Sequence, residues 1–161
     1  MVRALSLEEY RHPLAGFSLP VPPGWERIED PQDGVALITA EPPDGDTEFR
    51  SNAVVTVESL PFEFDLGEWQ DSAETLLPQQ LPNYSLIDRE RLDYEGRQVI
   101  RRLAHYVTAE TGSVTMEQWA TIAGGTGFTL TASISTLAYD SLADVFAEMA
   151  LRFRPETEVS P

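Results

Sequence analysis

The chain has 161 residues, of which 42% are hydrophobic, enough for one domain with a sizeable core. It contains no cysteine and no lysine, which excludes disulfide bonds, thiolate zinc sites, cysteine nucleophiles and the Schiff-base or P-loop chemistry of lysine. With 27 acidic and 11 basic residues the formal net charge is −16, so nucleic acids and anionic lipid surfaces are poor partners.

The first half of the chain predicts short strands joined by turns. We expect residues 1–15 to form an N-terminal arm that carries His12. The arm has several charges and no continuous apolar run, so it predicts neither a signal peptide nor membrane insertion, and we expect a cytoplasmic protein. Apolar and β-branched runs between proline- and acid-rich turns then predict four strands, at Phe17–Leu19, Trp25–Ile28, Val35–Ala40 and Asn52–Leu60, with a loop over Glu41–Glu48.

A first helix is predicted to begin at Asp65. Asp65 and Glu68 have the spacing of a capping box, and apolar residues recur at helical intervals from Leu66 to Leu77. We expect Pro78 and Pro82 to end this helix, because proline has no backbone N–H and clashes with the preceding turn.

The second half predicts long antiparallel strands followed by a second helix. Strands are expected at Tyr84–Leu92 and Gln98–Thr108, then after Gly112, and again at Phe128–Ser135, where apolar and hydroxyl side chains alternate. Apolar residues between Leu142 and Phe153 then recur three and four apart, and we expect the tail 155–161 to be frayed. The chain is thus predicted to be a single α+β domain over residues 1–161, with an antiparallel sheet of about six to seven strands and two main helices.

The hairpin loops decide which residues share a face of this sheet. A loop over Ala109–Gly112 would place Val107 opposite Val114. A three-residue loop over Gly124–Thr126 would place Phe128 opposite Ile122, whereas a two-residue turn would place it beside Thr121. We favour the three-residue loop, which puts Phe128 and Ile122 together on the core face.

This register places five candidate binding residues on the opposite face: Arg102, Tyr106, Glu117, Trp119 and Thr131. An aromatic ring and a guanidinium among hydroxyl groups would suit the docking of a protein segment. The competing hypothesis, which the usual burial of large side chains favours, is that the helix beginning at Asp65 or the N-terminal segment covers this face and that Trp119 belongs to the core.

Catalytic motifs are weak. The chain has only two histidines, His12 and His105, and no nucleophile placed beside either, so we predict no catalytic residue, no metal site, no cofactor and no enzymatic activity. Two further hypotheses stay open. One is a carboxylate-based hydrolase with sugar contacts from Trp25, Trp69 and Trp119; the second is a small-ligand sensor with an apolar pocket beside Met116 and Phe146.

Three segments resemble a known superfamily: Gly16–Trp25 (GFSLPVPPGW), Leu81–Ile87 with its continuation to Glu95–Arg97, and Ala150–Arg154. Together they are similar to the PsbP-like superfamily, and more closely to its bacterial DcrB and effector-adaptor branch and to actinobacterial LpqN-type proteins. The resemblance covers residues 16–154 and consists of structural motifs.

The resemblance implies an antiparallel sheet layered with helices and a binding or adaptor role without an active site. Effector-adaptor members are chaperones that hold apolar segments of secreted effectors, often as dimers. It therefore implies a protein partner and allows a homodimer. This sequence lacks the lipobox cysteine of a lipoprotein, and its predicted docking face is more hydroxylic than a groove for a membrane helix.

Overall fold

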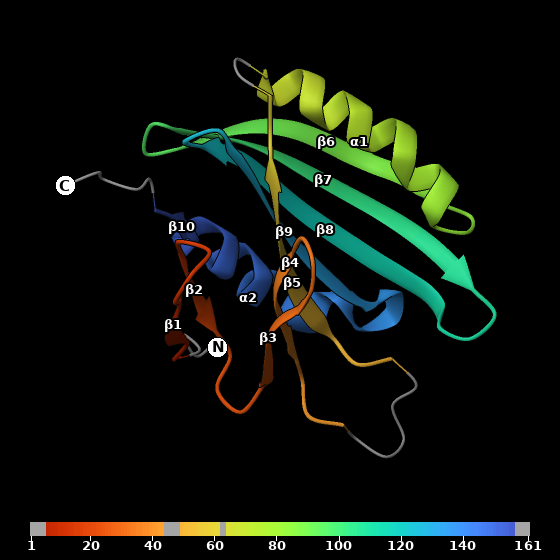
Figure 1. Cartoon of the computed structure of the whole chain (residues 1–161). Helices are drawn as coiled ribbons and strands as arrows, with labels where there is room; N and C mark the ends of the chain where they lie inside the picture. The colour runs from red at the N-terminus through yellow and green to blue at the C-terminus, as the bar shows by residue number, and fades with distance from the viewer. Residues whose placement is uncertain (1–5, 44–48, 62–63, 157–161) are drawn as a thin grey trace.

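The computed structural model describes residues 6–43, 49–61 and 64–156 and shows an α+β fold with two antiparallel sheets (Figure 1). This confirms the predicted fold class. The elements are, in chain order, β1 (Glu8–His12), β2 (Phe17–Val21), β3 (Glu26–Gln32), β4 (Val35–Ala40), β5 (Asn52–Ser59), α1 (Leu66–Gln80), β6 (Ser85–Tyr94), β7 (Arg97–Thr108), β8 (Gly112–Ala123), β9 (Thr126–Ser135), a 3-10 turn η1 (Thr136–Ala138), α2 (Tyr139–Arg152) and β10 (Arg154–Pro155).

The main sheet has seven strands in the order β3-β4-β5-β9-β8-β7-β6, as many as predicted. A second sheet, in the order β1-β2-β10, was not predicted. Its first strand occupies residues assigned to a flexible arm, and that part of the prediction is wrong because Tyr10 and His12 are buried against the core. Arg154 and Pro155 pair with β2, so the chain stays ordered to Glu156, and the rest of the expected frayed tail lies outside the described residues.

The two helices lie on opposite faces of the main sheet (Figure 1). Helix α2 and the small sheet cover one face, which we call the α2 face, and their apolar side chains form the main core with Trp119, Phe128 and Leu130. Helix α1 lies along β7 and β8 on the other face, the α1 face, where Leu66 and Trp69 pack on Ile100 and Ala120. The single domain is therefore a sheet between two layers.

Helix α1 begins as predicted but ends later. The Asp65 carboxylate caps it by accepting the backbone N–H of Glu68 at 3.2 Å. Pro78 lies inside its last turn, and the helix runs on to Gln80, where the Leu81 N–H bonds the Leu77 carbonyl. Pro78 removes only one hydrogen bond and does not end the helix, so of the two prolines predicted to stop it only Pro82 lies beyond its end.

Both predicted hairpin registers are wrong by one residue. Val107 lies opposite Ser113 rather than Val114, because the first loop is one residue shorter than expected. Phe128 lies opposite Thr121, and Ile122 lies opposite Gly127, because Gly124 and Gly125 form a two-residue turn with φ of +57° and +78°. Phe128 and Ile122 therefore point to opposite faces.

The two errors share one cause, the strand β8. Strands β7 and β9 keep their predicted relation to each other, and only β8 is inverted between them. Seven of its twelve residues, from Val114 to Thr121 without Gln118, are buried, on both faces. A strand covered on both sides has no alternation from which its register can be read.

Candidate functional site

The five predicted binding residues do not share a face. Arg102 pairs with Gln118, whereas Trp119 pairs with Arg101, so Arg102 and Trp119 point to opposite sides of the sheet. Tyr106 and Thr131 lie with Arg102 on the α1 face, and Glu117 lies with Trp119 on the α2 face. The common docking floor is therefore wrong. The competing hypothesis holds in part: α1 covers Arg102, and Trp119 is core, but on the opposite face and not under α1.

Arg102 fastens α1 to the sheet. Its side chain is 1% exposed, and its Nε donates to Glu74 Oε1 at 2.6 Å. The two terminal nitrogens donate to the side chains of Gln70 and Gln118 at 3.0 Å and to the Gln70 carbonyl at 3.1 Å. The Tyr84 hydroxyl also donates to Glu74, at 3.0 Å. Four of the five N–H donors of this buried guanidinium are thus used within the protein, so Arg102 is a structural group.

Glu117 and Trp119 are equally enclosed on the α2 face, each 4% exposed. The Glu117 carboxylate accepts the Nε–H of Arg101 at 2.6 Å and the hydroxyl of Tyr139 at 2.9 Å. Burial, together with the charge of Glu117, raises the pKa of Tyr139 to about 12. This cluster ties α2 to β7 and β8. Whether any of the five residues contacts a partner stays a prediction.

The α1 face is covered over only part of its width. Helix α1 lies over β7 and β8, and at one end of the sheet its Trp69 also reaches Gly127 of β9 and Glu58 of β5. Within the described residues, the helix makes no comparable set of contacts with β9, β5, β4 or β3. A row of directly paired residues crosses the whole sheet here, in the order Ile28, Ile38, Val54, Thr131, Gln118, Arg102 and Arg89. Its first four residues line what we call the open sheet face. Ile28 is 49% exposed, and the other three are partly exposed.

A groove of 240 Å³ runs where the open sheet face meets the free flank of α1. One wall is helical and includes Leu76, which is 51% exposed. Among the described residues that line it, the only ionisable side chain is Glu58, whose carboxylate accepts the indole N–H of Trp69 at 3.2 Å. Apart from Glu58 the lining consists of uncharged apolar, amide and hydroxyl side chains: Thr56, Trp69, Gln70, Ala73, Leu76, Leu77, Gln80, Gln118 and Thr129.

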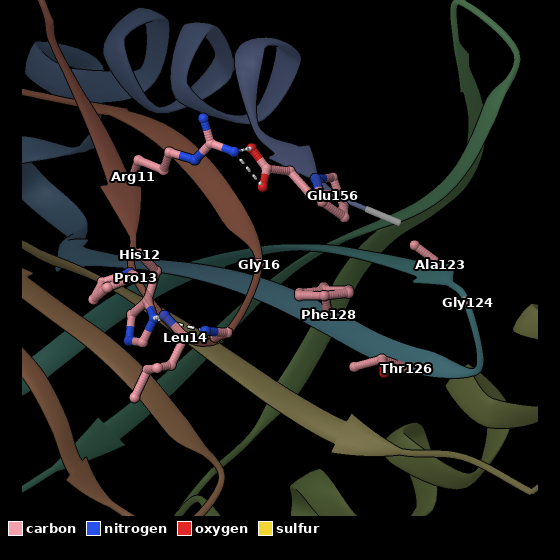
Figure 2. A pocket seen from close by; sticks show the side chains of 12 residues that line it. Arg11, His12, Pro13, Leu14, Gly16, Ala123, Gly124, Thr126, Phe128 and Glu156 are labelled. Carbon is pink, nitrogen blue, oxygen red and sulfur yellow. Dashed lines mark hydrogen bonds and ion pairs between the residues drawn. The ribbon is translucent and has the colours of Figure 1, made fainter. Parts of the chain in front are cut away.

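A larger open cleft, of 820 Å³, lies on the other side of the molecule between the β1–β2 turn and the β8–β9 turn (Figure 2). Phe128 lies between these turns, and Arg11 and Glu156 form an ion pair of 2.8 Å across the top of the view. The one carboxylate among the described residues of this lining is thus already paired with a cation. Because a glycosidase needs two cooperating carboxylates, this cleft does not support the hydrolase hypothesis.

His12 lies at the wall of this cleft, but it is buried and its ring nitrogens are both engaged, so it is not available as a base. It is 2% exposed; its Nδ1 accepts the backbone N–H groups of Leu14 and Ala15 at 3.1 and 2.8 Å. Since Nδ1 accepts both bonds, the proton lies on Nε2, which donates to Asp30 at 3.0 Å. His12 therefore shapes the turn that presents Leu14, which is 86% exposed.

The tryptophan site of a hydrolase and the apolar pocket of a sensor both lack a geometric basis. Trp69 and Trp119 are buried on opposite faces and Trp25 packs against Phe146, so the three tryptophans do not gather around one site. Met116 lies on the α1 face and Phe146 in the core of the α2 face, so they cannot line one pocket. Among the described residues no three potential His, Asp or Glu ligands cluster, and no helix has the length and hydropathy of a membrane span.

Comparisons with known proteins identify the fold. The sequence matches no protein-family model and no curated protein. Cyanobacterial PsbP (CyanoP) from Synechocystis has a TM-score of 0.72 at 18% identity, over 96% of this chain and 95% of that chain. The fold is PsbP-like. The Ran-binding protein Mog1p of Saccharomyces cerevisiae has a TM-score of 0.67 at 15% identity, over 96% of this chain and 97% of that chain. LpqN of Mycobacterium tuberculosis, described as involved in cell envelope biogenesis, has a TM-score of 0.65 at 16% identity, over 94% of this chain and 91% of that chain.

The PsbP-like fold confirms the structural side of the resemblance, including the LpqN type. The open sheet face, by contrast, was not predicted from the sequence. Ile28, Ile38 and Val54 were each assigned to a strand, but their alignment in one row depends on the strand order and on a bulge in β4 between Val35 and Leu37. Neither has a signal in a single sequence.

Proposed function

We propose that this PsbP-like protein is a non-enzymatic protein-binding module, and that the open sheet face with the adjoining groove holds a segment of a partner polypeptide. One observation carries the proposal: within the described part of the chain, a helix seals one sheet face over β7 and β8, whereas the same face over β9 to β3 has no such cover apart from Trp69 at Gly127. An antiparallel sheet that faces water on one side normally carries polar residues there. Here the exposed row is Ile28, Ile38 and Val54.

The chemistry of the surface favours a polypeptide over other ligands. Uncovered apolar surface beside a groove is typical of interaction sites. The amide of Gln80 and the hydroxyls of Thr56 and Thr129 can both donate and accept, as a peptide requires. Mog1p, which shares the fold, is a Ran-binding protein, so the architecture is compatible with a protein partner.

A second copy of this chain is a poor occupant. Two chains of net charge −16 repel each other, and none of the described residues lining the groove is an arginine that could meet Glu58 of another copy. If the chain dimerised through the open sheet face, its molecular mass in solution would double as its concentration rises, and the Ile38→Asp variant would stay monomeric. That result would replace the partner proposed here by self-association.

Selection from a displayed library of random peptides tests the proposal. We expect peptides that compete with one another for the protein, lose binding to Ile38→Asp, and keep binding to Leu151→Asp. Leu151 is a suitable control because it is 45% exposed on α2, at the other face of the sheet. Peptides that bind Ile38→Asp as tightly as the wild type would overturn the proposal, as would a selection that enriches none.

A further inference from the structure

We infer that the occupant is an amphipathic α-helix that lies beside α1 and carries a lysine or arginine opposite Glu58. The inference rests on the proposed function and specifies the partner's shape and charge. It begins from the width of the uncovered surface. Neighbouring strands lie about 4.8 Å apart, so two strands span roughly the 10 Å diameter of one helix. Helix α1 covers β7 and β8, and the four open strands leave room for a second helix at ordinary packing distance.

The pairing of the strands argues against an extended occupant. Each of β9, β5 and β4 is already paired on both sides, so none has free backbone groups to which another strand could add. An occupant that lies over these three strands, away from the free edge of β3, must bind through side chains alone and must satisfy its own backbone hydrogen bonds. A helix does both.

The lining of the groove selects the character of that helix. Leu76 and Leu77 in the groove, with Ile38 and Val54 on the open sheet face beside it, require apolar side chains on the face that docks. A uniformly apolar helix is unfavourable, because it would bury the exposed amide of Gln80 without offering it a partner. The helix should therefore have an apolar stripe with polar residues along its flank.

The positive charge inferred for the partner follows from the position of Glu58. It is exposed, and among the described residues it forms no ion pair; its one hydrogen bond there is to Trp69. By contrast, Glu74 next to the groove is already held by Arg102. A cation of the partner at this end of the groove would pair with Glu58, and the net charge of −16 would speed the approach of a basic segment.

Three synthetic helices of about 15 residues separate this inference from the proposed function. All share one leucine stripe, and their polar positions hold lysine and glutamine, glutamine only, or glutamate and glutamine. Binding is followed through the indole N–H resonance of Trp69, which reports on the groove, and helix formation through circular dichroism. We expect the lysine peptide to bind about fivefold more tightly than the glutamine peptide, and the glutamate peptide to bind least.

The decisive variant is Glu58→Gln, whose amide oxygen can still accept the Trp69 N–H. It should remove the lysine preference and leave the affinity for the glutamine peptide unchanged; Leu137→Asp, at a side chain 99% exposed outside the groove, should change neither. If the glutamine peptide binds but lysine adds nothing and Glu58→Gln has no effect, the inference is overturned and the proposed function stands. If a wholly leucine helix binds best, the amphipathic partner is wrong. If no peptide binds, or all bind Ile38→Asp equally well, the proposed function fails as well.

Discussion

Two halves of one sheet face are built from the same row of paired residues, yet they differ in character. In the covered half, under α1, the row consists of the long polar residues Gln118, Arg102 and Arg89. Arg102 and Arg89 form hydrogen bonds to the helix, and Gln118 accepts one from Arg102. In the open half, it consists of Thr131 and the apolar Val54, Ile38 and Ile28, which lie outside the part of the face that α1 covers. Polar residues lie where the face is sealed and apolar ones where it is bare.

This distribution of polar and apolar residues shows which half of the face is complete without a partner. Buried polar groups are tolerated under α1 because each has a partner, whereas exposed apolar groups gain nothing until something covers them. The covered half should therefore respond to substitution through stability and the open half through binding.

The largest expected effect is at Arg102. In Arg102→Leu, Glu74 and the amides of Gln70 and Gln118 lose their shared partner beneath the helix. Removing one member of a buried charged network typically lowers the free energy of unfolding by about 3–5 kcal/mol. Urea unfolding would measure this.

A double variant separates the charge from the packing. Arg102→Leu with Glu74→Leu leaves no unpaired carboxylate, so it should be more stable than Arg102→Leu alone. Equal stability of the single and double variants would mean that the lost packing of Arg102, and not the orphaned Glu74, causes the destabilisation. A single variant as stable as the wild type would show that the network does not hold α1 in place.

The next largest effect is at Gly127, on the border between the halves. A Cβ at this position would lie 2.6 Å from two ring atoms of Trp69, so the indole packs directly on the backbone of β9. Gly127→Ala should displace Trp69 and destabilise the protein by about 1–3 kcal/mol, the usual cost of overpacking. In the background of Trp69→Leu the same substitution should cost much less, which a double-mutant cycle of unfolding free energies would reveal.

Much of the fold was predictable because its signals are local. Strand β4 has its predicted bounds, Asp65 caps α1, and the alternation in β9 gives its true buried face. Strand β1 was missed because its sequence, EEYRH, is mostly charged, and only its long-range pairing with β2 buries Tyr10 and His12. Such a pairing has no local signal.

The site was predictable only in part. The idea that one sheet face is available for docking survives in Thr131, which lies on the open sheet face. The other four residues were misplaced or covered, since the inversion of β8 exchanged the faces of Glu117 and Trp119 and α1 sealed Arg102. A one-residue change of register moves every side chain of a strand, so an error at two loops altered the whole surface.

A smaller effect is expected at Tyr84, whose hydroxyl donates to Glu74 at the edge of the covered half. Glu74 keeps Arg102 as a partner in Tyr84→Phe, so the cost should be only about 0.5–1.5 kcal/mol. Burial, then the hydrogen bond and charge of Glu74, raise the pKa of Tyr84 above its usual value. The contribution of this tyrosine is therefore complete below the pKa of an unfolded tyrosine, about 10, and is lost as the pH rises above it.

Unfolding at about pH 8 and about pH 11 would test the sign. The stability of the wild type relative to Tyr84→Phe should decrease from the lower pH to the higher one. The other tyrosines with raised pKa values are present in both proteins, so their contribution cancels in this difference. A difference that grows with pH would contradict the role of Tyr84 as a donor to Glu74.

The smallest effect is expected in the open half, where two neighbouring valines of β5 offer a matched pair. Val55 is fully buried on the α2 face, and Val54 is partly exposed in the open row. Threonine has the shape of valine with one hydroxyl, so Val55→Thr buries a polar group at a cost of about 1–3 kcal/mol. Val54→Thr should change the unfolding free energy by no more than about 0.5 kcal/mol, because water still reaches the hydroxyl. Equal losses at the two positions would mean that the open sheet face is already covered in solution, either by another part of the chain or by a second copy, and the division between the halves would then be wrong.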